Sequence, residues 1–133
     1  MYNSIDEAIK ILEPKGFEIN DPWDIVDAFE TLIAMYSGSK YAVSCDSCTN
    51  AMFMCLKYLN AKGEISIPNK TYVSVPALII HSGCRIKFED YEWSGTYQLE
   101  PYPVIDGATR FRKGMYEKDT FHCLSFHFKK ILP

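Results

Sequence analysis

The chain has 133 residues, of which 47% are hydrophobic, 14% aromatic and 23% charged. This balance is that of one ordinary globular domain, and it excludes a disordered chain. The net charge of −3 gives no general attraction to polyanions, and no apolar run approaches the ~20 residues that a membrane-spanning helix needs. We therefore expect a globular protein that binds neither nucleic acid nor membrane.

The cysteines and histidines limit the chemistry further. Five cysteines occur, an odd number, and the N-terminus has no basic region and no apolar core of the kind that marks a secretory signal. Free thiols in a reducing compartment fit best, so we expect a cytoplasmic protein. The three histidines include no pair with metal-ligand spacing on one predicted helix face, and we expect no metal site.

The first 38 residues predict two helices. Asp21 followed by Pro22 is a typical helix start, and Gly38 is a typical helix end. Apolar residues recur at helical spacing before and after that start. They are Ile5, Ala8, Ile9 and Leu12 in the first helix, and Val26, Phe29, Ile33 and Tyr36 in the second. We expect residues 1–38 to form an N-terminal helical arm.

From Lys40 onward, strand-like and helix-like segments alternate. The predicted strands are residues 41–45, 64–67, 84–88, 96–99, 104–105 and 120–126, and the predicted helices are residues 47–59 and 71–81. This alternation favours an α/β fold with a mostly parallel sheet and flanking helices. Ligands of such sheets bind outside the carboxyl ends of the strands, so the residues that follow each strand are the candidate site residues.

Two of these strand ends lead into helices. After the first strand, the small residues 45–50 lead into a helix whose N-terminal N–H groups suit a phosphate. Simple helix capping by Ser47 or Thr49 explains the same residues without a ligand. After the second strand, Tyr72 offers a ring that either stacks on a planar ligand or packs as an ordinary half-exposed tyrosine.

Two further strand ends carry charged residues. Asp106 follows residues 104–105 and is a candidate partner for a cation or a protonated ring nitrogen. Lys129 and Lys130 follow the last strand, where a lysine in a desolvated, cationic pocket becomes a nucleophile. A solvated surface charge is the ordinary interpretation of either lysine, so the case depends on the whole set of strand-end residues.

A thiol redox protein is a separate hypothesis. Cys45-x-x-Cys48 lies between a predicted strand and a helix, and a helix N-terminus lowers the pKa of a thiol. The tryptophan and proline that usually flank such a pair are absent from this motif. Replacing Cys45 and Cys48 with serine would abolish any disulfide exchange.

Four motifs occur at these strand ends, and together they resemble a known family. They are A-V-S-C-D-S-C-T-N-A-M at residues 42–52, P-N-K-T-Y-V-S at 68–74, V-I-D-G-A-T at 104–109 and S-F-H-F-K-K at 125–130. In this order they resemble the DegT/StrS family of pyridoxal-phosphate-dependent sugar aminotransferases, which share the aspartate-aminotransferase fold. The resemblance implies a partial cofactor-binding large domain over residues 39–133.

The resemblance also implies a role for each matched residue. Lys130 corresponds to the lysine that binds pyridoxal phosphate covalently, and Asp106 corresponds to the carboxylate that pairs with the pyridine nitrogen. Tyr72 corresponds to the aromatic residue that stacks on the ring. The implied cofactor site is completed by the backbone of Cys48, Thr49 and Ser125 at the phosphate, and by Thr109 near the ring hydroxyl.

The sequence departs from the family pattern in several places. Cys48 replaces the usual glycine of the phosphate turn, where a side chain would crowd the backbone. Thr109 replaces a frequent glutamine, and the stretch between Phe88 and Val104 is shorter than usual. The chain is also much shorter than the family, so the resemblance implies the N-terminal piece of an aminotransferase.

The implied reaction is transfer of an amino group from an amino acid such as glutamate to a keto group on a nucleotide-linked sugar. The family works in polysaccharide and antibiotic-sugar pathways, and a homodimer is its expected form. A non-catalytic binding or structural module that keeps the fold is the alternative. In that case the apolar surface normally covered by the missing domain would dock a partner or a second copy.

Overall fold

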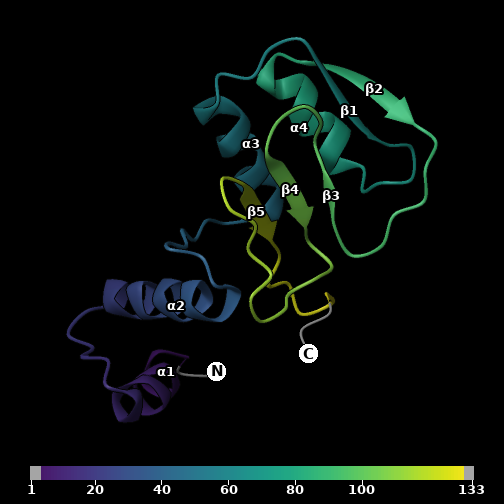
Figure 1. Cartoon of the computed structure of the whole chain (residues 1–133). Helices are drawn as coiled ribbons and strands as arrows, with labels where there is room; N and C mark the ends of the chain where they lie inside the picture. Colours follow the sequence, from purple (N-terminus) through teal and green to yellow (C-terminus); the bar gives the residue numbers. More distant parts are fainter. Residues whose placement is uncertain (1–3, 131–133) are drawn as a thin grey trace. The chain divides into compact units, whose positions relative to one another are not determined.

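The computed structural model describes residues 4–130, which fall into two compact units divided between Ser44 and Cys45 (Figure 1). No helix among residues 4–130 is long and apolar enough to cross a membrane. The first unit holds α1 (Ser4–Leu12), the 3₁₀ helix η1 (Glu13–Lys15) and α2 (Pro22–Ser37). The second unit holds α3 (Cys48–Tyr58), β1 (Glu64–Pro68), α4 (Ser74–Ser82), β2 (Arg85–Glu89), β3 (Tyr97–Gln98), β4 (Val104–Gly107) and β5 (Phe121–Leu124).

Helix α2 begins and ends where the sequence predicts. The side chain of Asp21 accepts a hydrogen bond from the N–H of Trp23 at 2.7 Å. Asp24 accepts from the N–H groups of Asn20 and Asp21, and these two bonds hold the pKa of its carboxyl below the ordinary value. Gly38 ends the helix with a φ of 81°, a left-handed conformation that costs glycine little.

The segment 41–45, predicted as a strand, is not a strand. It pairs with no strand within residues 4–130, and Tyr41 and Val43 are 72% and 83% exposed. The N–H and hydroxyl groups of Ser44 donate to the carboxylate of Glu30 instead, at 2.5 and 2.8 Å. Apolar residues favour a strand only where a neighbouring strand completes the backbone hydrogen bonds, and the described residues 4–130 supply no such neighbour.

Two small sheets form the centre of the second unit. Strand β1 pairs parallel with β2, and β4 pairs parallel with β5 and antiparallel with β3. Backbone hydrogen bonds in both directions between Ser66 and Glu100 join the two sheets. The chain thus has a mixed α/β structure, as the alternating pattern predicts, although the sheets are small and one pairing is antiparallel.

The antiparallel pairing results from a tight turn between β3 and β4. The N–H of Leu99 donates to the carbonyl of Val104 at 2.8 Å, and the N–H of Tyr102 donates to the carbonyl of Leu99 at 2.9 Å. This register places Tyr97 opposite Asp106. Directly opposed residues present their side chains on the same face of a sheet. The turn therefore brings a phenol beside a carboxylate.

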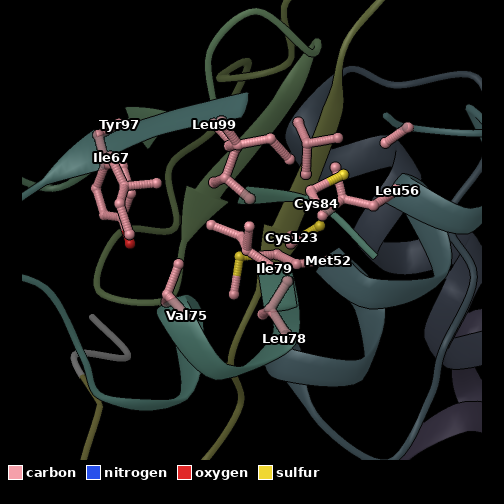
Figure 2. Packing of buried hydrophobic residues seen from close by; sticks show 13 residues of the cluster. Met52, Leu56, Ile67, Val75, Leu78, Ile79, Cys84, Tyr97, Leu99 and Cys123 are labelled. Atoms are coloured by element: carbon pink, nitrogen blue, oxygen red, sulfur yellow. The ribbon is translucent and has the colours of Figure 1, made fainter. Parts of the chain in front are cut away.

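Helices α3 and α4 pack against each other and on the strands of the second unit (Figure 1). Each fully buried aliphatic side chain stabilises such a core by roughly 1.5–3 kcal/mol. The core therefore fixes the strand ends that carry the candidate site. Figure 2 shows its main side chains: Met52 and Leu56 from α3, Val75, Leu78 and Ile79 from α4, and Ile67, Tyr97, Leu99 and Cys123 from the strands and their flanks.

Candidate functional site

The predicted phosphate turn forms the N-terminus of α3. Ser47 is the N-cap, and its hydroxyl accepts a hydrogen bond from the N–H of Asn50 at 3.2 Å. The first backbone bond of the helix is donated by Ala51 to the carbonyl of Ser47. The N–H groups of Cys48 and Thr49 therefore precede the bonded part of the helix, where such groups suit an anion. Helix capping accounts for Ser47 but not for Thr49.

Two hydroxyl groups meet beside this helix N-terminus. The Oγ1 atom of Thr49 lies 2.8 Å from the Oγ atom of Ser74, the first residue of α4. Hydroxyl groups at a helix N-terminus add donors for a phosphate to those of the backbone. Ser74 was not among the predicted site residues, although it ends the motif at residues 68–74. Its place in that motif is the signal that identifies it.

Cys48, which replaces the usual glycine, turns its side chain toward β5. Its thiol donates to the carbonyl of Cys123 at 3.2 Å. Burial, and next the negative charge of Asp106, raise the pKa of the Cys48 thiol to about 12, while the charge of Lys130 opposes them. The thiol therefore stays protonated at neutral pH. This opposes a redox role for the pair with Cys45, because the thiolate is the reactive form.

Asp106 is a buried carboxylate with a hydrogen bond on each oxygen. It lies in β4 near the carboxyl end and is 6% exposed. Its Oδ1 atom accepts from the N–H of Ala108 at 2.9 Å, and its Oδ2 atom accepts from the hydroxyl of Tyr97 at 2.7 Å. Burial, and next the charge of Asp106, raise the pKa of Tyr97, so the phenol keeps its proton and remains a donor.

Tyr72 and Lys130 come together on the exposed side of the site. Helix α4 begins at Ser74 rather than at residue 71, which leaves Tyr72 in the preceding turn with 66% of its surface exposed. The Nζ atom of Lys130 lies 5.3 Å from the centroid of the Tyr72 ring, within the range of a cation–π interaction. The amine of Lys129 lies over the ring of Phe128 instead. The two neighbouring lysines therefore have different surroundings.

Thr109 and Ser125 make their hydrogen bonds elsewhere. The hydroxyl of Thr109 donates to the carbonyl of Gly95 at 3.1 Å and so holds the loop before β3. A Cβ atom on Gly95 would lie 1.8 Å from the Nε atom of Arg110 and would displace that flexible side chain, and the φ of 80° at Gly95 itself favours glycine. The Oγ atom of Ser125, just after β5, lies 3.5 Å from the N–H of His127.

Residues 5–120 match the model of the DegT/DnrJ/EryC1/StrS aminotransferase family. The chain belongs to this family. Its members are generally dependent on pyridoxal phosphate. The match ends before Ser125 and Lys130, so the roles of these two residues depend on their motif and on the geometry described above.

Two curated proteins are similar to part of the chain. The spore coat polysaccharide biosynthesis protein SpsC of Bacillus subtilis (strain 168) is 36% identical over 89 residues, which cover 63% of this chain and 22% of the relative. The uncharacterised protein MJ1066 of Methanocaldococcus jannaschii is 29% identical over 89 residues, which cover 65% of this chain and 23% of the relative. The chain thus spans less than a quarter of these relatives. The comparison with solved structures gave no match.

The residues at this edge of the fold suit pyridoxal phosphate. The N-terminus of α3, with the hydroxyls of Thr49 and Ser74, suits an anionic phosphate. The buried carboxylate of Asp106 suits a protonated pyridine nitrogen. The exposed ring of Tyr72 is open to stacking, and the Lys130 side chain beside it carries an amine, the kind of group that bonds to an aldehyde.

Proposed function

We propose that this chain carries the cofactor-binding part of a pyridoxal-phosphate-dependent sugar aminotransferase. The whole enzyme transfers an amino group from an amino acid such as glutamate to the keto group of a nucleotide-linked sugar. Membership of the aminotransferase family supports the transferase chemistry, and the name of the Bacillus relative supports a place in polysaccharide biosynthesis. The observation that carries the proposal is the approach of the Lys130 amine to the Tyr72 ring.

Each candidate residue has a proposed task. When bound, pyridoxal phosphate supplies an electron sink for negative charge on the substrate carbon. Asp106 would pair with the ring nitrogen and keep it protonated, and Tyr72 would cover one face of the ring. Lys130 would hold the cofactor and could carry a proton on its Nζ atom. The backbone of Cys48 and the side chains of Thr49, Ser74 and Ser125 would bind the phosphate at the start of α3, and Thr109 would face the ring hydroxyl.

Covalent labelling of the full chain tests this proposal. The chain is mixed with pyridoxal phosphate and reduced with borohydride, and the modified peptide is identified by mass spectrometry. We expect a pyridoxyl group on Lys130 that disappears in Lys130→Ala. Lys129→Ala is the matched control, and it should label like the wild type because the Lys129 amine lies over Phe128. Labelling that persists in Lys130→Ala would contradict the proposal and favour a non-catalytic module.

We also propose the larger organisation of the protein. Residues 1–38 act as an N-terminal arm, residues 39–133 belong to a cofactor-binding large domain, and the protein works as a homodimer in the cytoplasm. The typical dimeric state of the family supports the dimer, and five free cysteines support a reducing compartment. Light scattering on the full chain should give the mass of two chains, and the mass of one chain would contradict the dimer.

A further inference from the structure

Tyr97 is a buried residue that no part of the proposed chemistry uses. It is 6% exposed, and its hydroxyl donates to Oδ2 of Asp106 at 2.7 Å. Its hydroxyl also bonds to the hydroxyl of Thr71. A phenol has one hydrogen to donate, and Tyr97 gives it to Asp106. Thr71 must therefore be the donor in the second bond, and the order of donation is Thr71 to Tyr97 to Asp106.

The ring of Tyr97 is held from the neighbouring loop. The Trp93 ring meets it edge-on, with centroids 4.7 Å apart and planes at 62°. The indole N–H of Trp93 donates to the carbonyl of Lys70 at 2.7 Å. The side chain of Lys70 in turn forms an ion pair with Glu92. The turn after β1 and the loop after β2 thus fix the phenol before any ligand binds.

These two hydrogen bonds connect Asp106 with the turn that carries Tyr72. Asp106 would meet the ring nitrogen, and Thr71 adjoins Tyr72, which would cover the ring face. A carboxylate is free to rotate about its last side-chain torsion unless its oxygens are bonded. The N–H of Ala108 fixes one oxygen of Asp106, and the hydroxyl of Tyr97 fixes the other. Consecutive hydrogen bonds also strengthen one another in a buried site.

We propose that Tyr97 is a positioning residue for the cofactor. Its hydroxyl, supported by Thr71, holds the Asp106 carboxylate in the orientation that binds a protonated pyridine nitrogen and couples that carboxylate to the Tyr72 turn. This inference rests on the proposed function, and it adds a residue outside the four motifs. The short connection between β3 and β4 supplies it, because the turn after Leu99 sets Tyr97 opposite Asp106.

The test measures the dissociation constant of pyridoxal phosphate for the full chain and its variants. Tyr97→Phe keeps the ring that packs on Trp93 and removes only the donor. We expect it to weaken binding about tenfold, since a hydrogen bond to a charged group is lost. Thr71→Val removes the supporting donor, and we expect about a threefold loss from that smaller change. It also serves as the second variant if Tyr97→Phe fails to fold.

Tyr102→Phe is the matched control. Its hydroxyl accepts from the N–H of Lys62 and donates to the carbonyl of the same residue, at 2.7 and 2.8 Å. The substitution removes a phenol that bonds to the backbone, so it should lower stability and leave the dissociation constant unchanged. A purely structural role for Tyr97 would give the same result as Tyr102→Phe, so the cofactor affinity distinguishes the two roles.

The Asp106→Asn background shows whether Tyr97 acts through Asp106. We expect Tyr97→Phe to change the dissociation constant in the wild-type background by about tenfold and in Asp106→Asn by less than twofold. Wild-type affinity in both Tyr97→Phe and Thr71→Val would overturn the inference and leave the proposed function standing. A wild-type chain that binds no pyridoxal phosphate would overturn both the inference and the proposed function. The wild-type chain is therefore measured before the variants.

Discussion

Asp106 and Lys130 belong to the same candidate site but differ in how the fold holds them. Asp106 is 6% exposed, and both of its carboxylate oxygens accept hydrogen bonds from elements of the core. Lys130 is half-buried, and its amine lies over the ring of Tyr72, a residue that is 66% exposed. The carboxylate side of the site is therefore part of the folded structure. The amine side remains accessible for chemistry, and changes on the two sides should affect different properties.

The largest effect is expected for Asp106→Ala. This change leaves the Tyr97 hydroxyl and the Ala108 N–H without their acceptor in a buried place, which should lower the free energy of unfolding by about 3 kcal/mol. Lys130→Ala should change it by less than ~0.5 kcal/mol. Urea unfolding of the full chain measures both values. Equal losses of unfolding free energy in the two variants would contradict the difference between a buried, structural Asp106 and an accessible Lys130.

Asp106→Asn separates the effect of the Asp106 charge from the effect of its hydrogen bonds. The amide oxygen still accepts the hydrogen bond from the N–H of Ala108, so the free energy of unfolding should fall by only about 1 kcal/mol. The negative charge is lost in both variants. If Asn cost as much as Ala, the charge rather than the hydrogen bonds would account for the stabilising effect of this residue.

The second prediction compares two cysteines near α3. Burial raises the pKa of Cys48 from its ordinary value of 9.0 to about 12, whereas Cys45 is exposed. Iodoacetamide at pH 8.5 should therefore modify Cys45 on the order of 100-fold faster than Cys48, because the thiolate is the reactive form. Peptide mapping gives both rates. In guanidinium chloride the two rates should become similar, and fast modification of folded Cys48 would restore the redox hypothesis.

The same pKa shift sets the sign of a pH effect on stability. Between pH 9.0 and about 12 the folded chain keeps the Cys48 proton that the unfolded chain releases. The contribution of Cys48 to the free energy of unfolding is therefore fully present below this window and is lost as the pH rises through it. Cys48→Ala should show a shallower fall of stability with pH in the same window.

The local elements of the chain could be predicted because their signals are local. Asp21 and Gly38 give the bounds of α2 within the sequence itself, and Ser47 starts α3 in the same way. The segment 41–45 could not be predicted correctly, because a strand depends on a partner that the segment itself does not encode. The same apolar residues could form a strand, but the structure shows them in an irregular and mostly exposed segment.

The partner of Asp106 depends on register, which is why sequence reasoning missed Tyr97. Residue 97 was expected only within a short strand, with no role for its hydroxyl. A turn that bonds Leu99 to Val104 necessarily sets 97 opposite 106, and the prolines at 101 and 103 mark that turn in the sequence. In an antiparallel hairpin, pairing of residues 99 and 104 implies pairing of Tyr97 with Asp106, so the position of the turn predicts this contact.

The smallest effect is expected on the exposed side, at Tyr72. Tyr72→Ala should weaken binding of pyridoxal phosphate about fivefold, as expected for the loss of one stacking contact, and Tyr72→Phe should leave it unchanged. Neither variant should change the free energy of unfolding by more than ~0.5 kcal/mol, because the ring is mostly exposed.

Phe128→Ala is the control for Tyr72, since Phe128 is also exposed, at 80%, and its ring lies near the amine of Lys129 rather than that of Lys130. It should bind the cofactor as the wild type does. Equal losses of affinity in Phe128→Ala and Tyr72→Ala would contradict a specific stacking role for Tyr72. A loss of stability in Tyr72→Ala as large as that in Asp106→Ala would show that both sides of the site are part of the folded structure.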